Sequence, residues 1–370
     1  MTETTLNQLH SNPIRARDLG IPFAGSPGRW NAITDVPGIQ VGYTTLIEDL
    51  PPDEIGPVAV RTGVTAILPD AHNRQLLRSW AGFSSFNGNG ELTGAHWINE
   101  AGFFLGPILL TNTHSVGMAH HACLQWLTRR AEYEASNDRW LLPVVAETCD
   151  DELNDINGFH VEVGHVVDAI ESAASGTIAE GNVGGGTGMR CYEFKGGTGT
   201  ASRMVKVGDQ SYTLAALVQA NFGLRKDLTI AGKPVGRLSR QAQGANRDSG
   251  SLIVIIATDA PLLPLQLQRI ARRCAIGMAR TGTPGYDGSG DLFLAFTTAR
   301  AQAGDKGSLV ETMPFLPSDQ LDALFEATVQ STEEAIVNAL VAAQSMVGHR
   351  GRSFEGVDLD WLAGLFDREL

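Results

Sequence analysis

Six short runs rich in valine, isoleucine, leucine and phenylalanine constrain the fold of this chain more than any other feature of its sequence. Each run is nearly continuous in apolar residues and is bounded by Gly, Pro or Asn. This pattern is typical of strands that are buried on both faces. The expected strands span 57–68, 106–113, 140–147, 211–222, 251–257 and 291–298.

Four other segments carry apolar residues at spacings of three and four, which predicts amphipathic helices. They are Ser115–Glu132, His160–Ala174, Leu263–Met278 and Ser318–Met346. Long amphipathic helices combined with doubly buried strands predict a layered α/β protein with helices outside and strands within. Because no low-complexity linker interrupts the pattern, we expect residues 1–370 to form a single domain.

The charge balance argues against nucleic acid as a partner. Acidic residues outnumber basic ones 41 to 28, and the formal net charge is −13, whereas phosphate binding needs a basic face. The first thirty residues lack a secretory signal pattern, and Asp259 and Pro261 interrupt the most apolar run, so we expect neither export nor a membrane span. Four widely spaced cysteines fit reduced thiols in a cytoplasmic protein.

Glycine is unusually frequent, with 42 residues, and the surplus over the usual frequency is clustered in 181–203 and 282–290. Such segments let the backbone approach a ligand or another backbone closely, and they predict a site built from loops. Neither turn of the first cluster satisfies GxGxxG, because Met189, Cys191 and Ser202 stand where the third glycine would be needed. A nucleotide- or phosphate-binding protein that uses the glycines of 184–199 stays open as an alternative function.

Other common catalytic motifs are missing from the sequence. There is no HExxH, no GxSxG and no Walker lysine. The adjacent His120 and His121 lie on an expected helix, where neighbouring side chains point in different directions. We therefore expect no metal site and no cofactor.

Ser251 lies where a polar, glycine-bearing loop, 240–250, meets an apolar strand. If the chain is cut between Gly250 and Ser251, the new α-amino group belongs to the nucleophilic residue itself. Its pKa of about 7.7 to 8.0 suits general-base catalysis near neutral pH. The residues alone leave two interpretations open, a self-processed nucleophile and an ordinary turn before a strand.

Several long, ordered motifs resemble the family of L-aminopeptidase D-Ala-esterase/amidases and β-peptidyl aminopeptidases. They are "RARDLGIPFAGSPGRWNAITDVPGIQVGYTTL", "NGNGELTGAHWINEAGFFLGPILLTNTHSVG", "PVVAET", "EGNVGGGTGMRCYEFKGGTGTASR", "SGSLIVIIATDAPLLP" and "GSGDLFLAFTTA". The resemblance implies an αββα sandwich similar to N-terminal-nucleophile hydrolases but differently connected. It also implies self-cleavage into a large subunit, 1–250, and a small subunit, 251–370, and assembly into homotetramers.

The resemblance also implies roles for individual residues. Ser251 matches the nucleophile, and Ser289 and Asp291 match a serine and an acid that orient its hydroxyl and amine. Asn221 matches an asparagine whose amide supports the oxyanion. Without the resemblance, these residues are more typical of turns at strand ends than of a catalytic site.

Two further residues are expected to contact the substrate. Glu147 resembles the carboxylate that holds the free amino group of the substrate; otherwise it is a charged residue that ends a buried strand. Cys149 stands where relatives often carry an aromatic residue, so the pocket is expected to be roomier here.

The expected function is that of a serine aminopeptidase or amidase acting on short peptides, amides or esters through an acyl-enzyme. An unprocessed, non-catalytic binding protein of the same fold is the remaining alternative.

Overall fold

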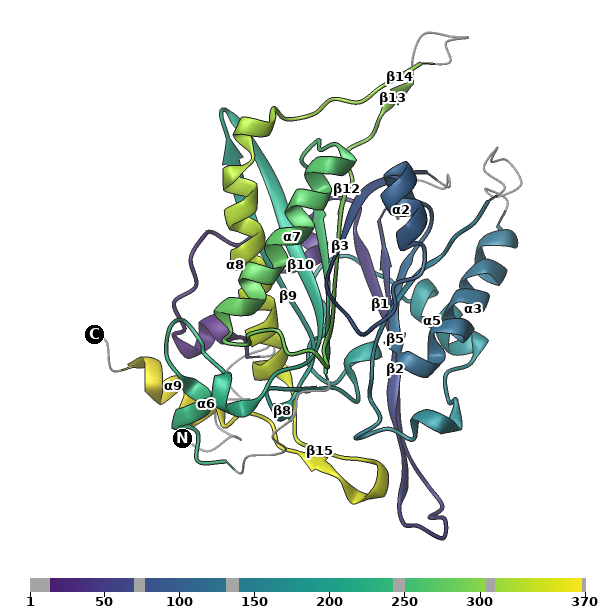
Figure 1. Ribbon diagram of the computed structural model, residues 1–370, viewed down its shortest axis with the longest axis vertical. Coiled ribbons are helices and arrows are strands. Elements are labelled where there is room, and N and C mark those ends of the chain that lie inside the picture. The colour runs from purple at the N-terminus through teal and green to yellow at the C-terminus, as the bar shows by residue number, and fades with distance from the viewer. Residues whose placement is uncertain (1–13, 70–76, 131–139, 242–249, 304–309, 368–370) are drawn as a thin grey trace.

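Two β-sheets pack face to face in this computed structural model, and a pair of helices covers the outer face of each sheet (Figure 1). The structure describes residues 14–69, 77–130, 140–241, 250–303 and 310–367. The four layers follow the order helix, sheet, sheet, helix. The αββα sandwich expected from the sequence motifs is therefore confirmed.

The larger sheet has six strands and carries the expected nucleophile near its centre. Its order is β4 (Phe103–Phe104), β3 (Ser79–Gly88), β12 (Gly290–Thr297), β11 (Ser251–Thr258), β10 (Gln210–Asn221) and β9 (Gly197–Val207). Strands β11 and β12 run parallel, while the other neighbours in this sheet are antiparallel. The smaller sheet has the order β1 (Gln40–Leu50), β2 (Val58–Leu68), β5 (Ile108–Asn112) and β6 (Val144–Thr148).

The helices divide between the two outer faces. Helices α7 (Pro264–Arg280) and α8 (Asp322–Ala342) cover the six-stranded sheet, and α3 (Val116–Thr128) and α5 (Val163–Glu171) cover the four-stranded one. The shorter elements are α2 (Ala95–Ala101), α6 (Val235–Leu238), α9 (Leu359–Phe366) and the strand pairs β7–β8 (Arg190–Cys191, Phe194–Lys195), β13–β14 (Gln302–Ala303, Glu311–Thr312) and β15–β16 (Met346–Val347, Ser353–Phe354).

Alternate residues of the central strands contribute to different hydrophobic layers. Ile253 and Ile255 of β11 pack between the two sheets, whereas Leu252 and Val254 pack against the helices of the larger sheet. Both faces of β11 are thus buried, which explains its continuous apolar sequence. No helix within the described ranges is long and apolar enough to cross a membrane.

The glycines of 184–199 allow close approach between layers, whereas residues 282–289 form a loop, as expected. A Cβ on Gly199 in β9 would overlap the backbone of Ala335 in α8. Residues 184–186 form a buried 3₁₀ turn, and a Cβ on Gly185 would overlap the side chain of Gln219. The glycines of 184–199 are therefore packed against protein atoms, which is not the arrangement of a phosphate-binding loop.

From the sequence alone, the piece 190–195 between the two glycine turns is expected to be one short strand, and this expectation is wrong. It is not one short strand but the hairpin β7–β8, which turns at Tyr192 and Glu193 with φ values of 51° and 59°. The second glycine turn is in fact the start of β9.

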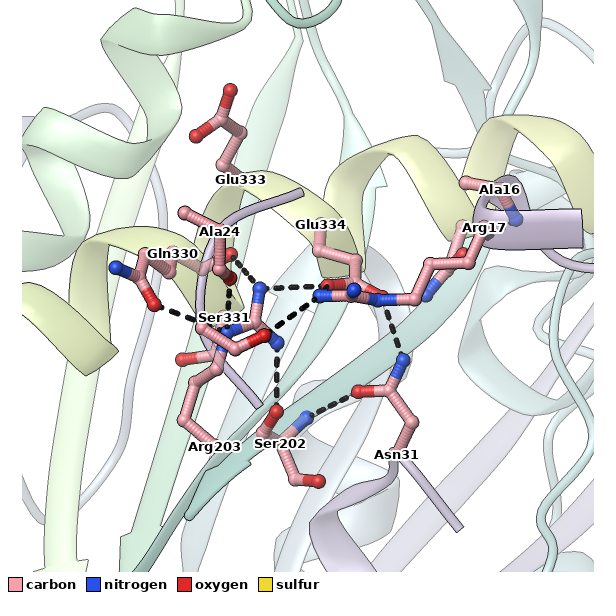
Figure 2. Close-up of polar contacts among 12 residues, drawn as sticks. Ala16, Arg17, Ala24, Asn31, Ser202, Arg203, Gln330, Ser331, Glu333 and Glu334 are labelled. Atoms are coloured by element: carbon pink, nitrogen blue, oxygen red, sulfur yellow. Dashed lines mark hydrogen bonds and ion pairs between the residues drawn. The ribbon is translucent and has the colours of Figure 1, made fainter. Parts of the chain in front are cut away.

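A buried polar network fixes the N-terminal segment to α8 (Figure 2). The carboxylate of Glu334 accepts hydrogen bonds from Arg17, Asn31 and Arg203 at 2.6 to 2.8 Å. Because both Glu334 and Arg203 are almost fully buried, this network belongs to the interior of the molecule.

Candidate active site

Ser251 is the first residue of β11 and lies between two neighbouring strands of the six-stranded sheet. Its register partners are Asn221 at the end of β10 and Gly290 at the start of β12. The side chain is buried, and its hydroxyl oxygen has no hydrogen-bond partner among the residues that the structure describes. A buried hydroxyl without a partner is uncommon, and it is the state expected of a group kept for chemistry.

The peptide bond expected to be cut is held tightly on its N-terminal side. The N–H of Gly290 donates to the carbonyl oxygen of Gly250 at 3.1 Å. A Cβ on Gly250 would overlap the carbonyl oxygen of Asn221, so no side chain fits at this position without movement of the backbone. Most of the expected polar loop, residues 242–249, lies outside the described residues.

Ser289 and Asp291 flank Gly290, the strand partner of Ser251. The Ser289 hydroxyl donates to Oδ1 of Asp291 at 2.8 Å, and Nδ2 of Asn87 in β3 donates to Oδ2 at 2.9 Å. Asp291 is fully buried and is aligned with Leu252 rather than with Ser251. Asp291 is thus opposite the residue that follows the nucleophile. Because side chains alternate along a strand, the carboxylate lies on the other face of the sheet from the Ser251 side chain.

Asn221 connects the larger sheet to the end of the smaller one. Its Nδ2 donates to the carbonyl oxygen of Cys149 at 2.8 Å, and its Oδ1 accepts from the backbone N–H of Arg190 at 3.0 Å. These two contacts fix the orientation of the amide. The second hydrogen of Nδ2 remains available to donate to another acceptor, as an oxyanion donor requires.

Glu147 lies near the end of β6 with its side chain buried. Oε1 accepts from the backbone N–H of Glu91 at 2.9 Å, and Oε2 accepts from the hydroxyl of Thr113. Burial raises the pKa of the Glu147 carboxyl above its ordinary value, although these two donors oppose the shift. A Cβ placed on Gly90 would lie 3.2 Å from Oε1 and 3.5 Å from the Cα of Gly290, which puts this carboxylate close to the strand partner of Ser251.

Cys149 is half-buried and contributes mainly its backbone to the site. Burial raises the pKa of its thiol to about 11, so the thiol is protonated near neutral pH and is a poor nucleophile. The nearby hydroxyl of Thr113, which donates to Glu147, opposes this rise in the pKa of the thiol only weakly.

The structure thus brings Ser251, Asn221, Ser289 and Asp291 together at one end of the larger sheet. Glu147 and Cys149 approach them from the smaller sheet. Among the described residues, no group of three or more His, Cys, Asp or Glu side chains is arranged to hold a metal ion.

Sequence reasoning missed several groups that support the site. They are Asn87, Thr113, the N–H of Gly290, and the buried residues Asp150 and Lys195. Asn87 and Thr113 lie far from their partners in the chain, and no local pattern marks them. Burial raises the pKa of Asp150 to about 7 and lowers that of Lys195 to about 7. Lys195 donates to the carbonyl oxygen of Met189 at 2.7 Å. It thereby fixes the backbone just before Arg190, whose N–H donates to Asn221. A lone lysine in "EFKGG" gives no sign of this role in the sequence.

The chain is similar to several known proteins. The chain is 49% identical over 356 residues to the β-peptidyl aminopeptidase BapA of Sphingosinicella microcystinivorans, covering 92% of this chain and 89% of the relative. The solved L-aminopeptidase D-Ala-esterase/amidase of Ochrobactrum anthropi, described as a variant of the Ntn hydrolase fold, superposes with a TM-score of 0.89 at 47% identity, covering 96% of this chain and 99% of that one. A β-aminopeptidase from Burkholderia sp. matches with a TM-score of 0.87 at 46% identity, covering 96% and 98% of the two chains.

The sequence profile described as Peptidase family S58 matches residues 31–354, which include every residue placed at the candidate site. The family inferred from the sequence motifs is confirmed, and the chain belongs to peptidase family S58.

Proposed function

We propose that this protein is a serine aminopeptidase that cuts itself between Gly250 and Ser251 and then releases N-terminal residues from short peptides, amides or esters. The observation that carries the proposal is the buried, unpartnered hydroxyl of Ser251 beside the constrained carbonyl of Gly250. The family match and the aminopeptidases among its relatives support the same reaction class.

In the precursor, the Ser251 hydroxyl attacks the carbonyl carbon of Gly250, and the C–N bond breaks to leave an ester. The N–H of Gly290 stabilises the negative charge that develops on the carbonyl oxygen. The hydroxyl proton ends on the leaving nitrogen, which becomes the free α-amino group of Ser251. Water then hydrolyses the ester, which releases the Ser251 hydroxyl and the carboxylate of Gly250.

In the processed enzyme, this amino group removes the proton from the Ser251 hydroxyl as it attacks the substrate carbonyl. Asn221 stabilises the oxyanion of the tetrahedral intermediate. Ser289 and Asn87 hold the carboxylate of Asp291. It orients the α-amino group of Ser251 rather than the Ser251 hydroxyl, because Asp291 is aligned with Leu252 and lies on the other face of the sheet from that hydroxyl. The acyl-enzyme is then hydrolysed by water.

Glu147 explains why the substrate needs an unblocked amino terminus. Its carboxylate is buried and already fixed by two donors, but each oxygen retains a lone pair for an ammonium group. Such a charge-assisted contact positions the first residue of the substrate with its carbonyl toward Ser251. Tetramer assembly and a cytoplasmic location stay predictions from the resemblance and the composition.

A denaturing gel of the purified protein tests the proposal. Wild-type chain should give two pieces, 1–250 and 251–370, and should hydrolyse alanine p-nitroanilide. Ser251→Ala should give one intact chain without activity. An intact wild-type chain without amidase or esterase activity would support the non-catalytic binding protein instead.

A further inference from the structure

The exposed residue Phe159 packs against His114, which follows the threonine that holds Glu147. The ring of Phe159 stacks on that of His114 with the centroids 6.0 Å apart and an angle of 22° between the planes. The Phe159 side chain is 64% exposed, so this stack leaves most of the ring available to another molecule.

The stack adjoins the amino-group site directly. His114 follows Thr113, whose hydroxyl donates to Glu147, in the 3₁₀ turn Thr113–Ser115 after β5. The imidazole is close enough to Glu147 to lower the pKa of its carboxyl. The stacked rings therefore begin one residue from the hydroxyl that holds the Glu147 carboxylate.

The loop that carries Phe159 is rigid, and it begins at the site. The backbone N–H and the side-chain amide of Asn154 both donate to Asp150, at 2.9 and 3.0 Å. The side-chain oxygen Oδ1 of Asn154 accepts from the N–H of Arg61 in β2 at 2.9 Å, and the N–H of Asp155 donates to the carbonyl oxygen of Ala59 at 2.8 Å. These bonds anchor the loop to the edge of the smaller sheet.

Phe159 also adopts a backbone conformation that a bulky residue normally avoids. Its φ and ψ are 52° and 46°, in the left-handed region, at the end of the 3₁₀ turn Ile156–Gly158. Unfavourable backbone at an exposed position persists where the surrounding structure imposes it, and such residues cluster at ligand sites. Burial of the phenyl ring in the core does not explain the residue, because the ring is exposed.

We infer that the stacked Phe159 and His114 rings form a side-chain subsite, which receives an aromatic or large apolar side chain from the residue whose amino group Glu147 binds. This inference rests on the proposed aminopeptidase function and names the substrate class of the same site. Ring stacking and apolar burial supply the preference, and the rigid loop keeps the ring in place without an ordering cost.

The test compares processed wild-type enzyme with Phe159→Asn, which tolerates the left-handed backbone but has no ring, and with Phe159→Tyr, which keeps the ring. The substrates are phenylalanine and alanine p-nitroanilides, together with the matching β-homoamino acid pair. In Phe159→Asn, the ratio of kcat/KM for the aromatic over the small substrate should fall about tenfold, mainly through KM. Phe159→Tyr should keep the ratio, and all variants should still cut themselves.

Phe315→Ala serves as the matched control, since Phe315 is 54% exposed and lies outside the site; it should leave the ratio unchanged. An unchanged ratio in Phe159→Asn, or an equal loss for both substrates, would overturn the subsite. Failure of the proposed function is distinguishable, because the wild-type chain would then hydrolyse neither substrate.

Discussion

Asn221 and Ser251 are register partners at matching ends of the antiparallel strands β10 and β11. Residues directly opposite each other in such a pair point to the same face of the sheet. The bond from Asn221 to the Cys149 carbonyl shows that this face is turned toward the smaller sheet. The amide and the hydroxyl therefore reach the same space from one rigid element, which favours precise positioning of a reacting carbonyl.

The first prediction concerns Gly250. Because any Cβ there overlaps the carbonyl oxygen of Asn221, Gly250→Ala should already slow self-cleavage by about tenfold or more, and Gly250→Val further. The fraction of cut chain over time on a denaturing gel measures this. Protein that does become processed should have normal kcat. Gly364→Ala is the control, since a Cβ there meets nothing within 4 Å, and normal cutting of Gly250→Val would refute the constraint.

The sequence predicted β11 and β12 to within one residue, because both faces of these strands are buried and their apolar runs are continuous. It did not reveal β9, where packing against α8 requires glycine rather than a branched residue. Strands β1 and β3 were also missed, since several of their residues are exposed and their sequences are polar. Site residues were found only where a motif carried them, because the contacts of Asn87 and Thr113 arise from the tertiary fold.

Asp291 is the subject of the second prediction. Asp291→Asn keeps the shape but replaces one acceptor oxygen with a donor that faces either the Ser289 hydroxyl or the Asn87 amide. We expect kcat to fall about 100-fold with little change in KM, since the carboxylate acts on the nucleophile and not on the substrate. Steady-state kinetics on processed protein measures this, and a change confined to KM would contradict the assignment.

The third prediction concerns Cys149 and selectivity. Cys149→Tyr adds a large ring and a hydroxyl beside Thr113 and Glu147, so the pocket should become narrower. The ratio of kcat/KM between small and bulky amide substrates should shift by about threefold to tenfold in favour of small ones. Cys149→Ser is the control for loss of the thiol, and unchanged selectivity in Cys149→Tyr would refute the idea.

Glu147 gives the fourth prediction, which concerns pH. Its carboxyl pKa is raised mainly by burial and also by the charge of Glu91, so the carboxylate becomes protonated at a higher pH than an ordinary glutamate. As pH falls through this raised pKa, the ion pair with the substrate ammonium is lost, and KM should rise. Glu147→Gln should raise KM by about 30-fold or more and should abolish this acid limb.

Glu91→Gln provides a sharp control for that pH effect. It keeps the backbone N–H that bonds to Glu147 but removes the neighbouring negative charge. The acid limb of the kcat/KM profile should therefore move to lower pH. If the acid limb of the kcat/KM profile stays in place in Glu91→Gln and is still present in Glu147→Gln, it arises from another ionising group, and the assignment to Glu147 is wrong.

The final prediction concerns stability and the polar network of Figure 2. Glu334→Ala leaves the guanidinium of Arg203 buried without its carboxylate, and it also releases Arg17 and Asn31. Removing one partner of a buried ion pair costs about 3 to 5 kcal/mol of unfolding free energy. Glu333→Ala, one residue earlier on α8, removes an ion pair with the half-exposed Arg280 but no hydrogen bond to Arg203 and should cost under about 1 kcal/mol.

The network also has a defined pH dependence. The two arginines and Asn31 lower the pKa of the Glu334 carboxyl despite its burial. A carboxyl whose pKa is lower in the folded state contributes stability above its unfolded pKa, and this contribution is lost as pH falls through the folded value. The measurement is urea unfolding in the Ser251→Ala background, in which the chain should stay in one piece. The free energies of unfolding with Glu334 and with Glu334→Ala should differ at neutral pH and become equal under acid conditions. Equal losses for Glu333→Ala and Glu334→Ala at neutral pH would show that the N-terminal segment is not held by this carboxylate.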